Sequence, residues 1–125
     1  MKYIIFVFFV SLNCYSEVYS NSYNTCIDSS SGVTPSILGC ISNEIKQVND
    51  GIDVLVDEKK KEYPEYVDYI EGTKKTHNRY VDRKCAIYNI SGGQSAIILQ
   101  AQCALNETIS YQVYINDLFE ILEYQ

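Results

Sequence analysis

Four cysteines constrain what this chain can fold into more than any other feature. Cys26, Cys40, Cys85 and Cys103 all follow an apolar N-terminal stretch. Such a pattern is typical of two disulfides in a small protein of an oxidising compartment, and three connectivities satisfy it. A zinc site is the alternative, but it needs closely spaced cysteines or nearby histidines, and the chain has 1 histidine. We therefore expect disulfides and neither a metal nor another cofactor.

The N-terminus has the pattern of a secretory signal peptide. Lys2 is followed by an uncharged stretch, Tyr3 to Leu12, which is shorter than the roughly 20 residues that a membrane-spanning helix needs. Small residues at useful spacing predict cleavage after Ser16 or Ser20. We expect residues 1–20 to be the signal peptide and residues 21–125 to be one mature domain, exported to the periplasm.

The fifth cysteine, Cys14, lies inside this leader. Ordinary cleavage removes Cys14 and leaves an even number of cysteines. The alternative is a lipoprotein signal, which would attach lipid to Cys14, although Asn13 before it is a poor match to such a signal. Contact with a membrane is expected only in that lipidated form.

The charge balance is acidic. The chain has 16 acidic and 10 basic residues, for a net charge of −6, and removal of Lys2 and Glu17 with the leader leaves it unchanged. An acidic protein repels nucleic acid and attracts basic partners. There are also 12 tyrosines and no tryptophan. Tyrosine is common at protein interfaces, but AT-rich coding bias together with half-buried helix positions is the favoured explanation.

Apolar periodicity predicts an all-α fold. The first helix opens at Thr34–Pro35, with Thr34 as N-cap, and ends near residues 62–64. The second runs from about Pro64 to Tyr88, and the third from Gln94 or Ser95 towards the C-terminus. Residues 17–33, rich in Ser and Asn, are expected as an extended arm. The prediction is three long antiparallel amphipathic helices with an N-terminal arm, stapled by two disulfides.

Gly92 and Gly93 form the predicted turn between the second and third helices. Antiparallel helices would place Cys85 and Cys103, on either side of this turn, opposite one another. The pairs Cys26–Cys40 and Cys85–Cys103 are therefore favoured. Each bridge would add about 3 kcal/mol to the stability of a small domain.

No catalytic constellation stands out. The glycine pair lacks the spacing of a phosphate-binding loop. Ser91 would need a base to act as a nucleophile, and His77 lies about four helical turns away on an apolar stripe, where a structural role is expected. With 16 acidic residues some carboxylate pair is inevitable, so a glycosidase pair has no specificity. We expect neither an enzyme nor a small-molecule substrate.

The cysteine frame resembles the LprI-like lysozyme-inhibitor family of small exported helical proteins, over roughly Cys26 to Leu118. The shared frame includes a Glu after the second cysteine, an Asp before the third, a glycine pair before the last and a Thr after it, at Glu44, Asp82, Gly92–Gly93 and Thr108. The chain departs from the family at four places. It has His77 for a tryptophan, Val81 for an arginine, Gln94 for a serine and Tyr111 for a late arginine.

The resemblance implies a periplasmic protein that binds and inhibits a lysozyme-type peptidoglycan glycoside hydrolase. That hydrolase would be host lysozyme or a competitor's muramidase toxin, which would make the chain an immunity protein. Many lysozymes are basic, which suits an acidic binder. The candidate contact loop is Gly92, Gly93, Gln94 and Ser95; its alternative is a simple helix–helix turn. The alternative function is an exported envelope interaction module with no muramidase target.

Overall fold

Four helices make up most of the chain in the computed structural model, which describes residues 18–124. They are α1 (Asn21–Ser29), α2 (Thr34–Glu62), α3 (Val67–Cys85) and α4 (Gly93–Glu123), with 3-10 segments η1 (Pro64–Tyr66) and η2 (Ala86–Ile90) at the two ends of α3. The expected all-α class and its three long helices are confirmed. The proposed leader falls mostly on residues 1–17, outside the described part.

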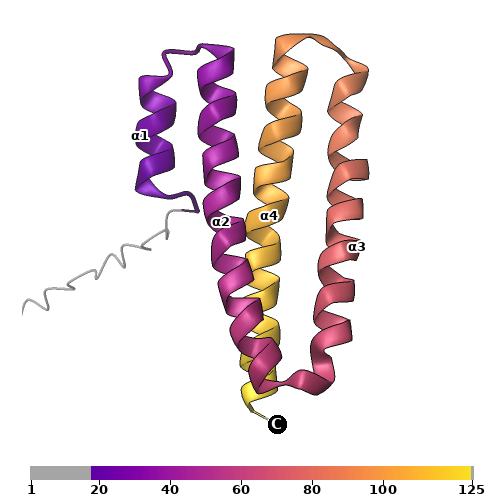
Figure 1. Ribbon diagram of the computed structural model, residues 1–125. Coiled ribbons are helices and arrows are strands. Elements are labelled where there is room, and N and C mark those ends of the chain that lie inside the picture. Colours follow the sequence, from indigo (N-terminus) through magenta and orange to yellow (C-terminus); the bar gives the residue numbers. More distant parts are fainter. Residues whose placement is uncertain (1–17, 125) are drawn as a thin grey trace, which may run out of the picture.

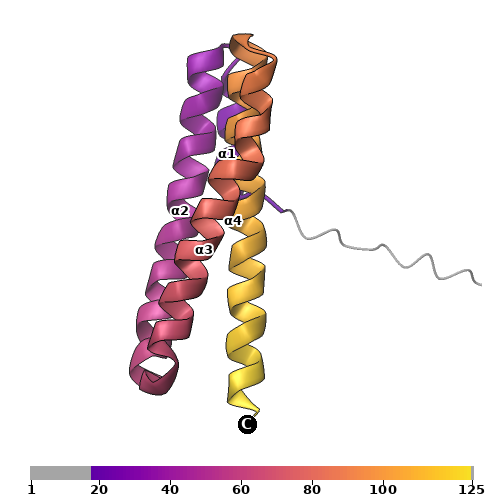
Figure 2. The same ribbon diagram turned by 90° about the vertical axis from the view of Figure 1, so that its right-hand side faces the viewer.

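The three long helices lie side by side along most of their length (Figures 1 and 2). α2 and α4 run in the same direction and cross near the middle of the molecule, and α3 runs antiparallel to both. α1 flanks one half of α2, on the side away from α3. α3 packs mainly on α4 and touches α2 only sparsely. The helix α3 is therefore held to the bundle chiefly through the side that faces α4.

The N-terminal arm is not extended as expected, because α1 forms within it. Ser20 caps this helix, since its side chain accepts a hydrogen bond from the Tyr23 backbone N–H. Tyr23, Cys26 and Ile27 recur on one face and pack on α2 and α4. The run of Ser and Asn hid this short apolar period in the sequence.

A buried carboxylate fixes the start of α1. Glu44 of α2 is 4% exposed and accepts two hydrogen bonds from Ser20, one from its N–H at 2.8 Å and one from its hydroxyl at 2.6 Å. The hydroxyl of Tyr23 donates to Gln102 of α4 at 2.9 Å. These bonds satisfy polar groups that would be costly to bury unpaired, and they tie α1 to both neighbours.

Thr34 does not cap α2 as predicted. It is the first residue of the helix, and Val33 takes the cap position without a side-chain hydrogen bond. The Thr34 hydroxyl instead donates to the Gln94 side chain at the start of α4, at 3.2 Å. Pro35 does lie in the first turn, where its missing N–H costs nothing.

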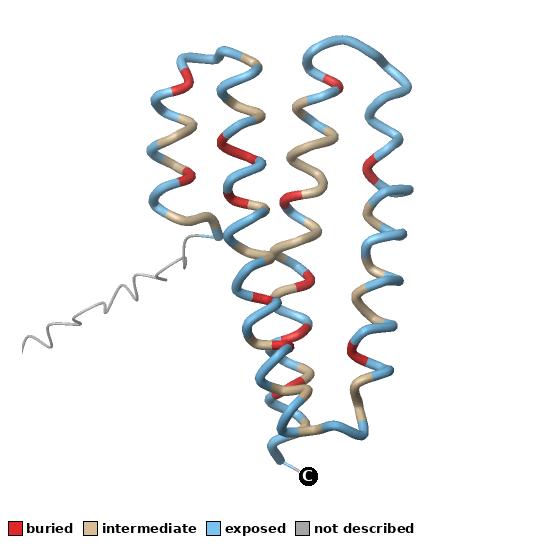
Figure 3. The backbone as a smooth tube through the Cα atoms, in the orientation of Figure 1, coloured by how far each residue is buried: buried red, intermediate tan, exposed pale blue. Residues whose placement is uncertain are grey.

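Two buried clusters form the core, one at each end of the bundle. Side chains from α1, α2 and α4 build the first, around Ile41 and Leu105. The second brings together α2, α3 and α4 around Ile52, Ile70 and Ile115. Figure 3 shows that buried positions alternate with exposed ones along α2 and α4, while most of α3 is exposed.

Both predicted disulfides are present. Cys26–Cys40 joins α1 to α2 with a Cα–Cα distance of 5.7 Å, and Cys85–Cys103 joins α3 to α4 at 5.6 Å. The second bridge links the end of α3 to the side of α4, as expected for positions that flank a turn. None of the described helices is both long enough and apolar enough to span a membrane.

Candidate functional site

The predicted contact loop lies at one tip of the bundle, between η2 and α4. Gly92 and Gly93 have φ of 67° and 83°, a left-handed conformation that strongly favours glycine. Gln94 and Ser95 follow in the first turn of α4 and are exposed. The neighbouring Ile87 and Ile90 are also exposed, Ile90 at 84%. The Ser91 hydroxyl donates a hydrogen bond to the Tyr88 carbonyl. The tip therefore presents a fixed turn beside apolar side chains.

A second candidate surface was not predicted from the sequence. An open groove of about 680 Å³ runs between α3 and α4. Its lining residues are Asp68, Tyr69, Gly72, Thr73, Thr76, His77 and Tyr80 of α3, and Glu107, Ser110, Tyr111 and Tyr114 of α4. We call this surface the tyrosine groove. Its lining contains four tyrosines, two carboxylates and neither lysine nor arginine.

The groove exists because α3 is anchored at its two ends. Ile70 and Cys85 are the buried residues of this helix. Ile70 packs in the cluster formed around Ile52 and Ile115, and Cys85 is joined to α4 by the disulfide to Cys103. Between these anchors the His77 ring stacks on Tyr111 of α4, with centroids 4.3 Å apart. Smaller side chains, Thr73 and Thr76, leave the space beside this stack open.

Tyr111 forms the floor of the groove. The residue is 5% exposed, and its hydroxyl is buried without a hydrogen-bond partner among residues 18–124. Burial, with a smaller contribution from Tyr114, raises the pKa of the Tyr111 phenol to about 12, so the hydroxyl keeps its proton at neutral pH. Burial also lowers the pKa of His77, although Glu107 opposes that change. The floor is therefore uncharged at neutral pH.

One end of the groove already holds a cation. The Lys84 ammonium lies over the Tyr80 ring, 5.5 Å from its centroid, and pairs with the Glu107 carboxylate. Hydrogen bonding to Glu107 and Tyr80 raises the pKa of Lys84. A ring face and a carboxylate together are a favourable environment for a positive charge.

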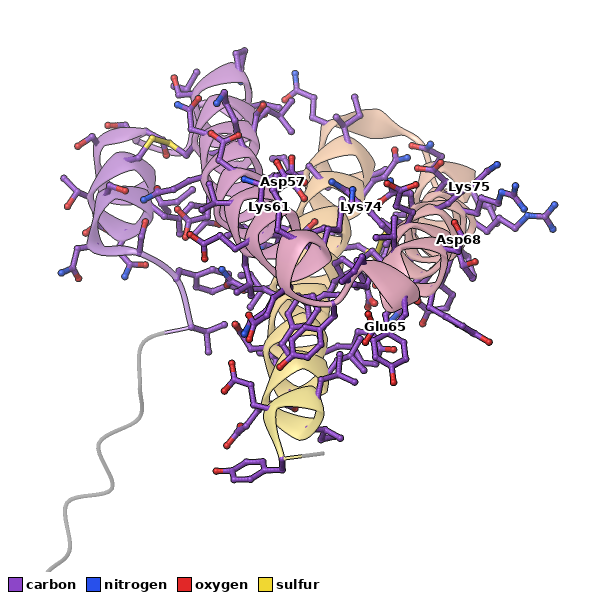
Figure 4. The ribbon with its side chains drawn as sticks, turned by 60° about the horizontal axis from the view of Figure 1, so that its bottom comes forward. Asp57, Lys61, Glu65, Asp68, Lys74 and Lys75 are labelled. Atoms are coloured by element: carbon purple, nitrogen blue, oxygen red, sulfur yellow. A yellow bond between two sulfur atoms is a disulfide. The ribbon has the colours of Figure 1, made fainter. Side chains whose placement is uncertain are left out.

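The other end of the groove carries a carboxylate without an ion-pair partner within the described residues. Asp68 lies on the side of α3 away from α2, whereas Lys74 lies on the side that faces α2 (Figure 4) and pairs with Asp53 there. Tyr69, which is 76% exposed, and Tyr114 line the groove with Asp68. This end therefore offers a negative charge and two ring surfaces.

The arrangement has the character of a binding surface. Ser110 donates to the Asn106 carbonyl and makes no hydrogen bond to His77, so the groove does not hold an activated serine. In the described part of the chain, no group of three or more His, Cys, Asp or Glu side chains could hold a metal ion. The sequence hid this surface because its tyrosines were attributed to half-buried helix positions, and because Tyr111 fell outside the predicted stripe.

The fold and its surfaces define a small disulfide-bonded helical protein suited to binding another protein. A family model described as antitoxin TsiV3 matches residues 31–123, and the chain belongs to this antitoxin family. Membership implies a toxin as protein partner and supports an immunity role. It does not support the LprI-like lysozyme-inhibitor family in particular. No curated protein and no solved structure shows a significant match.

Proposed function

We propose that this protein is an exported immunity protein that binds and neutralises a toxin which cleaves peptidoglycan as a lysozyme-type glycoside hydrolase. The observation that carries the immunity role is the antitoxin family match over residues 31–123, which spans α2, α3 and α4. The resemblance of the cysteine frame to LprI-like lysozyme inhibitors supports the choice of target. The protein would act by binding, without chemistry of its own.

Charge supports a basic hydrolase as the target. The chain carries a net charge of −6, and a basic enzyme would be drawn to it, which raises the association rate more than the final affinity. Peptidoglycan is itself anionic, so enzymes that bind it tend to carry positive surface. An acidic inhibitor can therefore compete for the same surface.

The disulfides and the proposed leader support export to an oxidising compartment. Two disulfides, each closing a helix pair, persist in an oxidising compartment and would be reduced in a cytosol. The periplasm is such a compartment, and peptidoglycan lies there. Lipidation of Cys14 would hold the same domain at a membrane.

The tip turn is the proposed inhibitory contact. Glycosidases cleave between two carboxylates in an open cleft, and a rigid projection can block such a cleft. Gly92 to Ser95 end the bundle in a turn whose backbone is fixed by two left-handed glycines. The Cys85–Cys103 bridge fixes the two helices behind it.

A peptidoglycan-lysis assay tests the proposal. The oxidised protein is titrated into a c-type lysozyme and, separately, into any muramidase encoded beside its gene, with a reduced sample in parallel. Stoichiometric inhibition of either enzyme is expected, and reduction should abolish it. If folded protein inhibits neither enzyme, the proposed target class is wrong and the alternative of an exported envelope interaction module is favoured.

Substitutions at the tip test the contact surface separately. Ser95→Arg places a bulky positive charge in the turn and should weaken inhibition at least tenfold. Ser42→Arg makes the same change at an exposed position of α2 and should have no effect. Equal inhibition by both variants would remove the tip from the interface while leaving the target in place.

A further inference from the structure

The tyrosine groove has properties that the tip and the immunity role do not explain. Monomeric proteins seldom expose contiguous apolar patches larger than a few hundred Å², and such patches often mark binding sites. Here the exposed rings of Tyr69, Tyr80 and Tyr114 gather around one concave surface. Tyrosine supplies large contact area at low entropic cost and is common among the residues that dominate binding energy. The groove therefore suits a protein segment.

The dimensions of the groove suit a short extended segment. Tyr69 and Tyr80, near its two ends, are separated by eleven residues of α3, which is about 16 Å along a helix. About five residues of extended chain cover that distance. Thr73 and Thr76 lie between them with small side chains, so the occupant meets ring surfaces at the ends and hydroxyl groups in the middle.

The charges of the groove lining favour a cationic occupant. The lining carries Asp68 and Glu107 but neither lysine nor arginine, and Glu107 is already paired with Lys84. The remaining negative charge at Asp68 lies beside the Tyr69 and Tyr114 rings. A cation there would meet the same combination that holds Lys84 over Tyr80, a ring face and a carboxylate. A second copy of this acidic chain would bring like charge instead.

The shape of an arginine side chain suits this end of the groove. A guanidinium group is planar, stacks on rings and donates several hydrogen bonds. It could rest against the Tyr69 or Tyr114 ring while donating to the Asp68 carboxylate, which an alkyl side chain could not do.

We infer that the tyrosine groove is a docking site for a cationic side chain, arginine above all, carried on an extended segment of the toxin. The inference rests on the proposed immunity function for its partner and adds a second contact, on α3 and α4, to the tip. Asp68 and the rings of Tyr69 and Tyr114 bind the cation.

The first test needs no toxin. The ¹⁵N-labelled oxidised protein is titrated with N-acetyl-arginine methylamide and, in parallel, with the citrulline counterpart, which has nearly the same shape and no charge. Amide shifts confined to the groove residues are expected for arginine, with a response at least fivefold weaker for citrulline. Equal responses, or shifts centred elsewhere, would overturn the inference.

Matched variants locate the charge that is recognised. Asp68→Asn should reduce the affinity for the arginine probe about fivefold, because it removes the unpaired carboxylate and little volume. Asp28→Asn makes the same change on α1, on the far side of α2, and should leave the affinity unchanged. Loss of binding in both variants would indicate general charge attraction and would overturn the site.

The second test uses the toxin and separates this inference from the proposed function. Tyr114→Ala should lower the affinity for a muramidase encoded beside the gene about tenfold, as measured by calorimetry. If the muramidase is inhibited equally by wild type and Tyr114→Ala, the groove is not a toxin contact and the immunity function stands. If no hydrolase is bound but arginine still fills the groove, the target class fails and the cationic site stands.

A second copy of this chain is the alternative occupant of the groove. Light scattering of wild type and Tyr114→Ala at matched concentrations decides it, and a monomer is expected for both. A wild-type dimer that Tyr114→Ala converts to monomer would assign the groove to a second copy and overturn the inference.

Discussion

The ring of His77 stacks on the ring of Tyr111 with centroids 4.3 Å apart and planes inclined by 19°. This contact joins the middle of α3 to α4, in the interval between the buried residues Ile70 and Cys85. It also separates the tyrosine groove from a smaller cavity of about 100 Å³ that faces α2. One aromatic pair therefore sets both the attachment of α3 and the depth of the groove.

Replacing Tyr111 with phenylalanine should stabilise the protein. The substitution removes a buried hydroxyl without a partner and keeps the stack, so the free energy of unfolding should rise by about 1 kcal/mol. Urea unfolding measures the effect.

Tyr23→Phe is the matched control for that experiment. The Tyr23 hydroxyl donates to Gln102, so its removal should destabilise the fold by about 1 kcal/mol. Opposite signs for the two substitutions are expected. A loss of stability in Tyr111→Phe would mean that its hydroxyl has a partner.

Acidification should destabilise the protein through His77. Burial lowers the pKa of the folded-state imidazole below its ordinary value of 6.5, so the unfolded chain binds the proton first as the pH falls. Stability contributed by the neutral ring is therefore complete above about pH 7 and is lost towards about pH 5. Because the chain has 1 histidine, a single imidazole resonance reports the titration.

His77→Gln tests this assignment. Thermal unfolding of the variant should depend less on pH between about pH 7 and about pH 5 than that of wild type, whatever its absolute stability. The charged side chains that line the same two cavities are Asp68, Lys74, Asp82 and Glu107. An unchanged pH dependence would assign it to those groups instead.

The two disulfides should differ in what they protect. Replacing either pair with alanines should lower the free energy of unfolding by about 3 kcal/mol, measured in urea. Only loss of Cys85–Cys103 should also abolish the response to the arginine probe, since Cys85 is one of the two anchors of α3. Equal loss of probe binding in the Cys26–Cys40 variant would contradict this division of roles.

Alanine substitutions at glycines should have opposite effects at the tip and within a helix. Gly93→Ala should cost about 1 kcal/mol, because φ is 83° there. Gly39 lies inside α2 with no heavy atom within 4 Å of an added Cβ, so Gly39→Ala should stabilise by about 1 kcal/mol. Differential scanning calorimetry compares them. Similar melting shifts in both variants would contradict the left-handed turn.

The mature chain should begin at Glu17 rather than at Asn21. Cleavage after Ser20 would remove the cap of α1 and both hydrogen bonds to Glu44, leaving a buried carboxylate without those donors. Cleavage after Ser16 keeps Ser20. Intact-mass measurement of exported protein distinguishes these products, and lipidation at Cys14 would add acyl mass. A mature N-terminus at Asn21 would refute this assignment.

Periodicity and spacing were enough to predict the three long helices and both disulfides. Apolar residues such as Ile41 and Ile52 in α2, and Leu105 and Ile115 in α4, lie at helical spacing. The buried face of a helix can therefore be predicted from its own sequence. The cysteine pairing followed because the positions that flank a turn between antiparallel helices lie opposite one another. α1 was missed, since its short apolar face of Tyr23, Cys26 and Ile27 lies among polar residues.

The sequence by itself therefore determined the helical class, the turn at Gly92–Gly93 and the covalent frame, because each depends on residues close together in the chain. Only the tertiary structure decided where α3 would lie. Its packing mainly on α4, fixed at Ile70 and Cys85, brings tyrosines from two helices around one groove and leaves the Tyr111 hydroxyl without a partner among the described residues. Such a surface depends on the lateral placement of two helices, which no local pattern encodes.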